Sequence, residues 1–219
     1  MRTQEKHATR FRSIQTSLLF GIVPAVIISM AVLSLMGYLS SKAIIQTSAG
    51  NEMSQCLSVA MGSIEMSLSN NRMVAETMAR GVEAVQRQAV KGEQTASDWD
   101  AAAYQEILTS VVGSNPETFG GGIWFEPYQY RPEQRYFSPY CMRQNGAVTY
   151  VDNYSLGEGV YYTDQDWYTN AANTTQKSVW SAPYYDEFAQ ISIVTSSAPI
   201  YDETGRFLGV ATADIDLTQ

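Results

Sequence analysis

Three short segments of the sequence combine aromatic rings with carboxylates. Residues 161–168 read YYTDQDWY, residues 180–186 read WSAPYYD, and Asp214 follows a run of uncharged side chains. An aromatic face attracts a cation by about 0.5 to 2 kcal/mol, and a shielded carboxylate attracts an ammonium more strongly than an exposed one does. Together the segments predict an amine-sized cage. The alternative is that Trp167, Tyr168 and Trp180 are core aromatics with solvated edges.

Catalysis and metal binding have weaker support in the residues. Asp164 and Asp166, or Asp186 and Glu187, could act as the acid and base of glycoside cleavage, which requires two carboxylates. However, the single histidine is His7 in the N-terminal tail, and the sequence lacks G-x-S-x-G, P-loop and H-E-x-x-H motifs. The two acids at 164 and 166 offer hard oxygens to calcium, but the EF-hand pattern is missing. We therefore expect a protein that is not an enzyme, with no catalytic residue, cofactor or metal site.

The distribution of charge near the N-terminus predicts a membrane anchor. Residues 13–41 carry no charged side chain, whereas residues 1–12 carry four basic ones. The apolar run 17–39 has 23 residues, which cover roughly 35 Å at about 1.5 Å per residue and can cross a bilayer. A cleaved signal peptide is the alternative, although its apolar region typically has only about 7 to 15 residues. The basic tail places the N-terminus in the cytoplasm and residues 42–219 in the periplasm or outside, in a single-pass protein of the cell (inner) membrane.

The rest of the chain is acidic. Residues 13–219 contain 10 basic and 21 acidic side chains, a balance that repels phosphate backbones and argues against nucleic-acid binding. Two cysteines, Cys56 and Cys141, do not make a disulfide framework.

A long helix followed by a sheet is expected to position the aromatic and acidic groups. Apolar or small residues recur with a period of 3.6 from Met53 to Ala89, which predicts an amphipathic helix over 42–92 that continues from the membrane span. A helix of this length needs a partner along its side. That partner is a second copy in a homodimer, the following domain, or both. Ser97 and Asp98 are expected to form an N-cap for a second helix that ends near residue 113.

From residue 118 onward the sequence predicts an antiparallel sheet. The expected strands are 121–127, 135–143, 147–153, 190–201 and 206–217, with an edge segment at 180–184 and a short helix at 164–173. Asn145-Gly146 and residues 202–205 are the expected hairpin turns. Side chains alternate along a strand, so one face, expected to floor a cavity, contains Leu208, Val210, Thr212, Asp214 and Asp216. Asp216 is expected to be solvated at the strand end. The opposite, small apolar face is suited to contact with a helix and contains Phe207, Gly209, Ala211, Ala213 and Ile215.

The order of these parts resembles the double Cache (dCache) sensor domain of bacterial methyl-accepting chemotaxis proteins and related transmembrane receptors. The matching motifs, within about residues 40–219, are GGIWFEP at 121–127, DWY at 166–168, WxxPYxD at 180–186 and DIDL at 214–217. The resemblance implies an α+β fold in which a transmembrane helix continues into a long outer helix that packs on a PAS-like antiparallel sheet. The implied parts are a cytoplasmic tail (1–12), a transmembrane helix (13–41), an outer helix (42–92) and a membrane-distal ligand-binding module (93–219). A proximal module, a second membrane helix and an output domain would be missing from this chain.

The same resemblance implies small-molecule sensing without catalysis. Members that bind amino acids have an Arg two residues before the Trp-Tyr pair, where it clamps the ligand carboxylate, and this chain has Gln165 there. A neutral amide cannot give the charge-assisted contact of Arg, so we expect an amine or amino-acid-like ligand. The implied ligand-binding residues are Gln165, Trp167, Tyr168, Tyr184, Asp186 and Asp214.

Several alternatives stay open at this point. Arg131, Arg135 or Arg143 could supply the clamp from a neighbouring strand. The sensor could belong to a histidine kinase or diguanylate cyclase instead of a chemoreceptor. A protein of another class, an extracytoplasmic carbohydrate-binding or hydrolytic domain, would also use aromatic surfaces and carboxylates.

Overall fold

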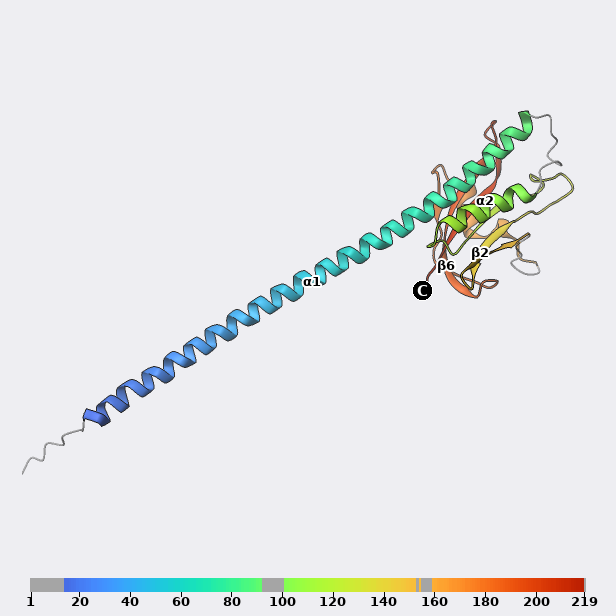
Figure 1. The fold of residues 1–219 in the computed structure, drawn as a ribbon. Helices are drawn as coiled ribbons and strands as arrows, with labels where there is room; N and C mark the ends of the chain where they lie inside the picture. The colour runs from blue at the N-terminus through green and yellow to red at the C-terminus, as the bar shows by residue number, and fades with distance from the viewer. Residues whose placement is uncertain (1–13, 92–100, 153, 155–158, 219) are drawn as a thin grey trace, which may run out of the picture. The chain divides into compact units, whose positions relative to one another are not determined.

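The computed structural model describes residues 14–91, 101–152, 154 and 159–218 (Figure 1). The tail predicted at 1–12 and the N-cap predicted at Ser97 and Asp98 lie outside the described residues. The chain divides into two compact units, Met1–Met61 and Gly62–Gln219. The sheet and its shorter helices all belong to the second unit.

Helix α1 (Ile14–Lys91) makes up the described part of the first unit and continues into the second. It has 78 residues and contains Pro24. Its side chains are exposed from Leu19 to Met66. Among the described residues, α1 is the one helix that is long and apolar enough to cross a membrane, with a window of mean hydropathy 2.5. The predicted continuous helix is confirmed, whereas the predicted boundary between residues 41 and 42 stays a prediction.

The second unit is built on an antiparallel sheet, which confirms the α+β class. The strand order is β3-β2-β1-β7-β6-β4, and β5 also pairs with β6. The strands are β1 (Gly120–Phe125), β2 (Tyr140–Gln144), β3 (Ala147–Val151), β4 (Val179–Trp180), β5 (Tyr184–Asp186), β6 (Ile191–Tyr201) and β7 (Phe207–Asp216). The helices are α2 (Ala101–Ser114), the 3-10 turn η2 (Tyr162–Asp164) and α3 (Asp166–Ala172).

The turns follow the sequence signals, and two strands differ from the prediction. Asn145 and Gly146 both have positive φ (51° and 80°), as the tight β2–β3 hairpin requires. The strand predicted from residue 135 begins only at Tyr140. The predicted edge segment at 180–184 consists of two short strands, β4 and β5, which both pair with β6.

Helices cover one face of the sheet through an apolar core. Val74, Met78 and Val82 of α1, with Leu108 and Val112 of α2, pack against the inner face of β1 and β7. This arrangement places the second-unit part of α1 and α2 beside the strands (Figure 1). Small residues allow the close approach: a Cβ added at Gly121 would lie 3.0 Å from the methyl carbon of Met78. The predicted packing of the long helix on the sheet is confirmed for this part of α1.

Three polar contacts also fix α1 on the sheet unit. Thr118 Oγ1 donates a hydrogen bond of 2.9 Å to Oδ1 of Asn71, which is fully buried. Ser178 Oγ donates to Glu76 Oε1 over 2.7 Å. The backbone N–H of Tyr201 donates to Glu83 Oε1 over 3.2 Å. Asn71, which interrupts the apolar stripe in the sequence, therefore has a buried partner.

The face pattern predicted for β7 holds only for its second half. Ala211 and Ala213 belong to the core under α1, as predicted, while Val210 belongs to the cluster on the other side. Leu208 and Phe207 are interchanged: Leu208 packs in the helix-side core and Phe207 in the opposite cluster. The reason is the irregular register between Ile200 and Tyr201 on β6, opposite Gly209 with φ 149°. An extra residue in one strand reverses the side-chain alternation beyond it.

Candidate ligand-binding site

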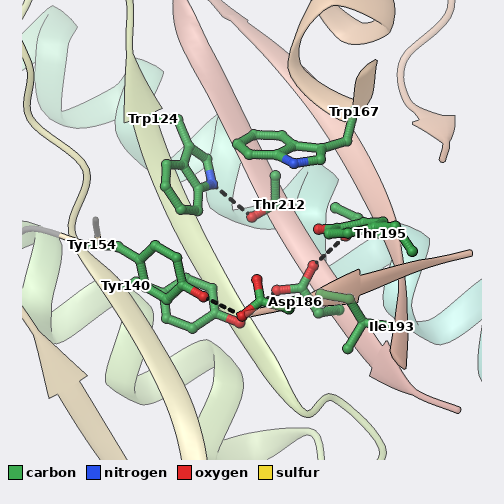
Figure 2. A pocket seen from close by; sticks show the side chains of 10 residues that line it. Trp124, Tyr140, Tyr154, Trp167, Asp186, Ile193, Thr195 and Thr212 are labelled. Carbon is green, nitrogen blue, oxygen red and sulfur yellow. Dashed lines mark hydrogen bonds between the residues drawn. The ribbon is translucent and has the colours of Figure 1, made fainter. Parts of the chain in front are cut away.

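The sheet face opposite α1 carries a small polar cavity, shown in Figure 2. Its volume is about 10 Å³, roughly room for one water molecule. The cavity is called the inner cavity below. It is lined by Trp124, Tyr140, Tyr154, Trp167, Tyr184, Asp186, Ile193, Thr195, Thr212 and Asp214. These described lining residues include two carboxylates and no cationic side chain.

Asp214 lies on β7 at the floor of the inner cavity and is only 3% exposed. The Tyr140 hydroxyl donates to its Oδ2 over 2.7 Å, and Thr195 Oγ1 donates to its Oδ1 over 2.7 Å. Because Thr195 uses its proton on Asp214, the Tyr184 hydroxyl, 2.9 Å away, donates to Thr195. Burial raises the pKa of Asp214 to about 7, although both hydrogen bonds oppose this rise.

The second carboxylate, Asp186, ends β5 and is 7% exposed. The Tyr154 hydroxyl (2.6 Å) and the Ala189 backbone N–H (2.7 Å) both donate to its Oδ1. Within the described residues no hydrogen bond falls on Oδ2, so this oxygen can accept a donor from a ligand. The negative charge of Asp186 further raises the pKa of Asp214, after the larger effect of burial.

Trp124 forms the aromatic centre of the site. Its ring contacts Trp167 and Tyr154 with centroid distances of 4.8 and 5.5 Å. Its indole N–H donates to Thr212 Oγ1 over 2.8 Å, which fixes the orientation of the ring. Burial raises the pKa of the Tyr140 and Tyr154 hydroxyls, and their contacts to the carboxylates add to the rise, so both tyrosines stay protonated donors.

Two glycines of β1 make room for this arrangement. A Cβ at Gly120 would collide with the Tyr140 hydroxyl, the group that donates to Asp214. A Cβ at Gly122 would lie 2.8 Å from both Trp124 Nε1 and Tyr140 Cδ2. Gly120 and Gly122 therefore leave room for the cavity side chains on one face of β1, and Gly121 leaves room for α1 on the other face.

Four of the six predicted site residues line the inner cavity: Trp167, Tyr184, Asp186 and Asp214. A fifth, Gln165, lines a neighbouring open groove of about 370 Å³, and its side-chain amide donates to the Tyr161 carbonyl over 3.3 Å. This groove is called the outer groove below. The sixth, Tyr168, donates from its hydroxyl to Glu126 Oε2 over 2.7 Å and packs against Tyr162 and Phe207. Tyr168 thus supports the wall of the site from behind.

The arginines proposed as replacement clamps have other partners. Arg143 donates to the carbonyls of Val112, Thr118 and Asn115 over 2.6 to 3.0 Å, which caps the C-terminal end of α2. Arg135 lies over the rings of Tyr136 and Tyr161, at 4.9 and 5.8 Å from their centroids.

Arg131 lies 5.0 Å from the centroid of Tyr130. These contacts give the three arginines structural roles outside the lining of the inner cavity.

Four polar or aromatic cavity residues were missed in the sequence: Trp124, Tyr140, Tyr154 and Thr195. A fifth, Thr212, was predicted on the cavity face of β7 but was not named as a site residue. Trp124 could have been found by the alternation of side chains, since Gly120, Gly122 and Trp124 share one face of β1, and Gly120 and Gly122 pair with Asp214 and Thr212 on the cavity face of β7. Tyr154 lies beyond the predicted strand, so no periodic signal marked it. Among the described residues, no group of three or more His, Cys, Asp or Glu side chains could hold a metal ion.

An antiparallel sheet with helices on one face and a buried polar cavity on the other defines the fold as a PAS-like sensor domain. The chain belongs to the family described as methyl-accepting chemotaxis protein-like, first PDC sensor domain, whose model matches residues 104–219, more than half of the chain. The predicted relationship to the Cache-type sensor domains of methyl-accepting chemotaxis proteins and related transmembrane receptors is thereby confirmed. No curated protein matches the chain significantly.

Solved structures share the fold. The extracellular domain of mmHK1S-Z3, described as a histidine kinase, is 23% identical with a TM-score of 0.54, covering 71% of this chain and 54% of that one. The corresponding domain of mmHK1S-Z2 is 22% identical with a TM-score of 0.51, covering 71% and 56%. The periplasmic sensory domain of the Campylobacter jejuni chemoreceptor Tlp1 is 14% identical with a TM-score of 0.50, covering 73% and 56%. This chain thus spans slightly more than half the length of each of these structures.

Proposed function

We propose that this chain is the outward-facing, membrane-anchored sensor region of a bacterial chemoreceptor, and that it binds an amine or amino-acid-like metabolite in the inner cavity. The observation that carries the proposal is the pairing of Asp186 and Asp214, both more than nine-tenths buried, in a cavity whose described lining has no cation. Two buried carboxylates without a counter-ion are costly, and a bound ammonium lowers that cost. The aromatic rings of Trp124 and Trp167 add an attraction for the same positive charge.

Gln165 supports an amine over an α-amino acid within this proposal. It stands where the resemblance implies a carboxylate clamp, and its neutral amide, which also donates to the Tyr161 carbonyl, cannot give a charged, bidentate contact. Arg143, the candidate on strand β2, is engaged at the end of α2. In this proposal Tyr184, Asp186 and Asp214 hold the ammonium, and no charged group takes the place of the carboxylate clamp.

The membrane topology belongs to the same proposal. The apolar part of α1 would cross the membrane over 13–41, with 1–12 in the cytoplasm and 42–219 outside. The exposed apolar side chains of α1 between residues 44 and 66 would form a homodimer contact near the membrane, including Ile45, Met53, Leu57 and Ile64. Sensing by the outer unit is common to chemoreceptors and receptor kinases, so the ligand-binding part of the proposal does not depend on the output domain.

Thermal unfolding of the full chain in lipid nanodiscs tests the binding. Wild type is compared with Asp214→Asn and with Glu203→Gln, a control that neutralises an exposed acid. A panel of amines, amino acids, carboxylates and sugars is added; a ligand at 100 times its dissociation constant should add about 2.7 kcal/mol to the stability. Amines should stabilise wild type and the control but not Asp214→Asn. Stabilisation by sugars or simple carboxylates alone would contradict the proposal.

A further inference from the structure

The inner cavity and the outer groove share a wall. Trp167 at the start of α3 and Tyr184 at the start of β5 line both of them. The volumes differ greatly, about 10 Å³ inside against about 370 Å³ outside. A ligand that reaches the buried carboxylates therefore has a small end in the inner cavity and the rest of its body in the groove beyond these two side chains.

The inner cavity matches one particular chemical group. A volume of about 10 Å³ accommodates a group about the size of a water molecule. The accepting atoms are Oδ2 of Asp186, which has no hydrogen bond from the described residues, and the remaining lone pairs of Asp214. A primary ammonium has this size and offers three N–H donors, whereas a trimethylammonium is larger and offers none.

The outer groove sets the character of the rest of the ligand. Its described lining contains the exposed carboxylates of Asp164 and Asp166 and no cationic side chain. Pro183 and the ring of Tyr185 provide apolar surface beside them. A carboxylate at the far end of a ligand would lie near like charges and would be repelled, whereas an uncharged carbon chain would not.

We propose that the two hollows form one site for a primary amine, whose ammonium fills the inner cavity while its carbon chain lies in the outer groove. Trimethylated amines and amines that end in a carboxylate are rejected. This inference rests on the proposed function and adds to it the ligand class and the residues that select it. Loss of the N–H donors leaves buried carboxylates unpaired, which should reduce the affinity by at least about 100-fold.

Isothermal titration of the full chain in nanodiscs at pH 8 tests this selectivity with three compounds of equal chain length. Butylamine should bind. Butyltrimethylammonium should bind at least about 100-fold more weakly, and 4-aminobutanoate about 10-fold more weakly. In the Asp164→Asn/Asp166→Asn double variant, the ratio of 4-aminobutanoate to butylamine affinity should rise, because the repelling charges are gone.

A variant that should bind one compound more tightly separates altered selectivity from loss of folding. Ile193 lines the inner cavity and is 2% exposed, so Ile193→Ala enlarges it. This variant should bind butyltrimethylammonium measurably better than wild type does, a result that loss of folding cannot produce. Equal wild-type affinities for butylamine and butyltrimethylammonium would overturn the inference while amine sensing stands. If none of the three compounds binds, the proposed function fails and the inference fails with it.

Discussion

Asp214 should make the sheet unit less stable as the pH rises from 4.5 to 7.5. Its pKa is about 7 in the folded chain because of burial, against 3.8 when exposed. Between these two values the unfolded chain has lost the proton that the folded chain retains, so folding becomes less favourable as pH rises. The stabilisation is fully present below about pH 4 and is lost by the time the pH passes 7.

The magnitude follows from the two pKa values. Each pKa unit of difference corresponds to about 1.36 kcal/mol of unfolding free energy. Because of this single group, the free energy of unfolding should fall by about 3 kcal/mol from pH 4.5 to 7.5. Asp214→Asn removes the titration and keeps a similar shape, with an amide oxygen that still accepts one of the hydrogen bonds from Tyr140 and Thr195. The unfolding free energy of the variant, measured relative to that of wild type, should therefore rise by about 3 kcal/mol between pH 4.5 and 7.5.

Denaturant unfolding at several pH values, followed by tryptophan fluorescence, measures this difference. Trp124 and Trp167 lie in the site, so the signal reports the sheet unit. Comparing the two chains at each pH cancels the titration of all other groups. A difference between wild type and Asp214→Asn that is constant over the whole pH range would refute the reasoning. Glu203→Gln, which changes an exposed carboxylate, should show that constant difference.

Three further predictions use other parts of the chain. Gly120→Ala should destabilise the protein by about 1 to 3 kcal/mol in urea unfolding, because the new methyl group displaces the Tyr140 hydroxyl; Gly113→Ala, where nothing lies within 4 Å, is the control. Butylamine affinity measured by titration calorimetry should fall up to tenfold per pH unit below about 7, since the ammonium must displace the proton of Asp214, and a flat profile would contradict this. Oxidation of the full chain in membranes should crosslink a homodimer through the exposed Cys56, and Cys56→Ser should abolish the crosslink.

The local patterns of the sequence predicted the parts of the fold that depend on neighbouring residues. The 3.6-residue period gave α1, the Asn145-Gly146 pair gave the β2–β3 hairpin, and alternation placed Asp214 on the cavity face of β7. The interchange of Leu208 and Phe207 was missed because the irregular register opposite Gly209 arises from how β6 and β7 pair.

The site was predicted in part for a similar reason. Asp186, Trp167 and Tyr184 stand in motifs that can be read locally, whereas Tyr140 reaches Asp214 across 74 residues of sequence. Such a contact depends on the strand order β2-β1-β7, with the small Gly120 between them, which no local pattern gives. The buried contact of Asn71 is equally remote in the sequence, since its partner Thr118 lies 47 residues away.

The three polar contacts of α1 determine how this helix can move. The hydrogen bonds at Asn71, Glu76 and Glu83 span 2.7 to 3.2 Å, and a slide of α1 by one residue would shift each of them by about 1.5 Å. Rotation of the helix about its axis would break the same three bonds and leave Asn71 buried without a partner. These three hydrogen bonds therefore oppose both movements of the second-unit part of α1 relative to the sheet unit. Any displacement of the strands caused by a ligand would carry this part of the helix with it as one body.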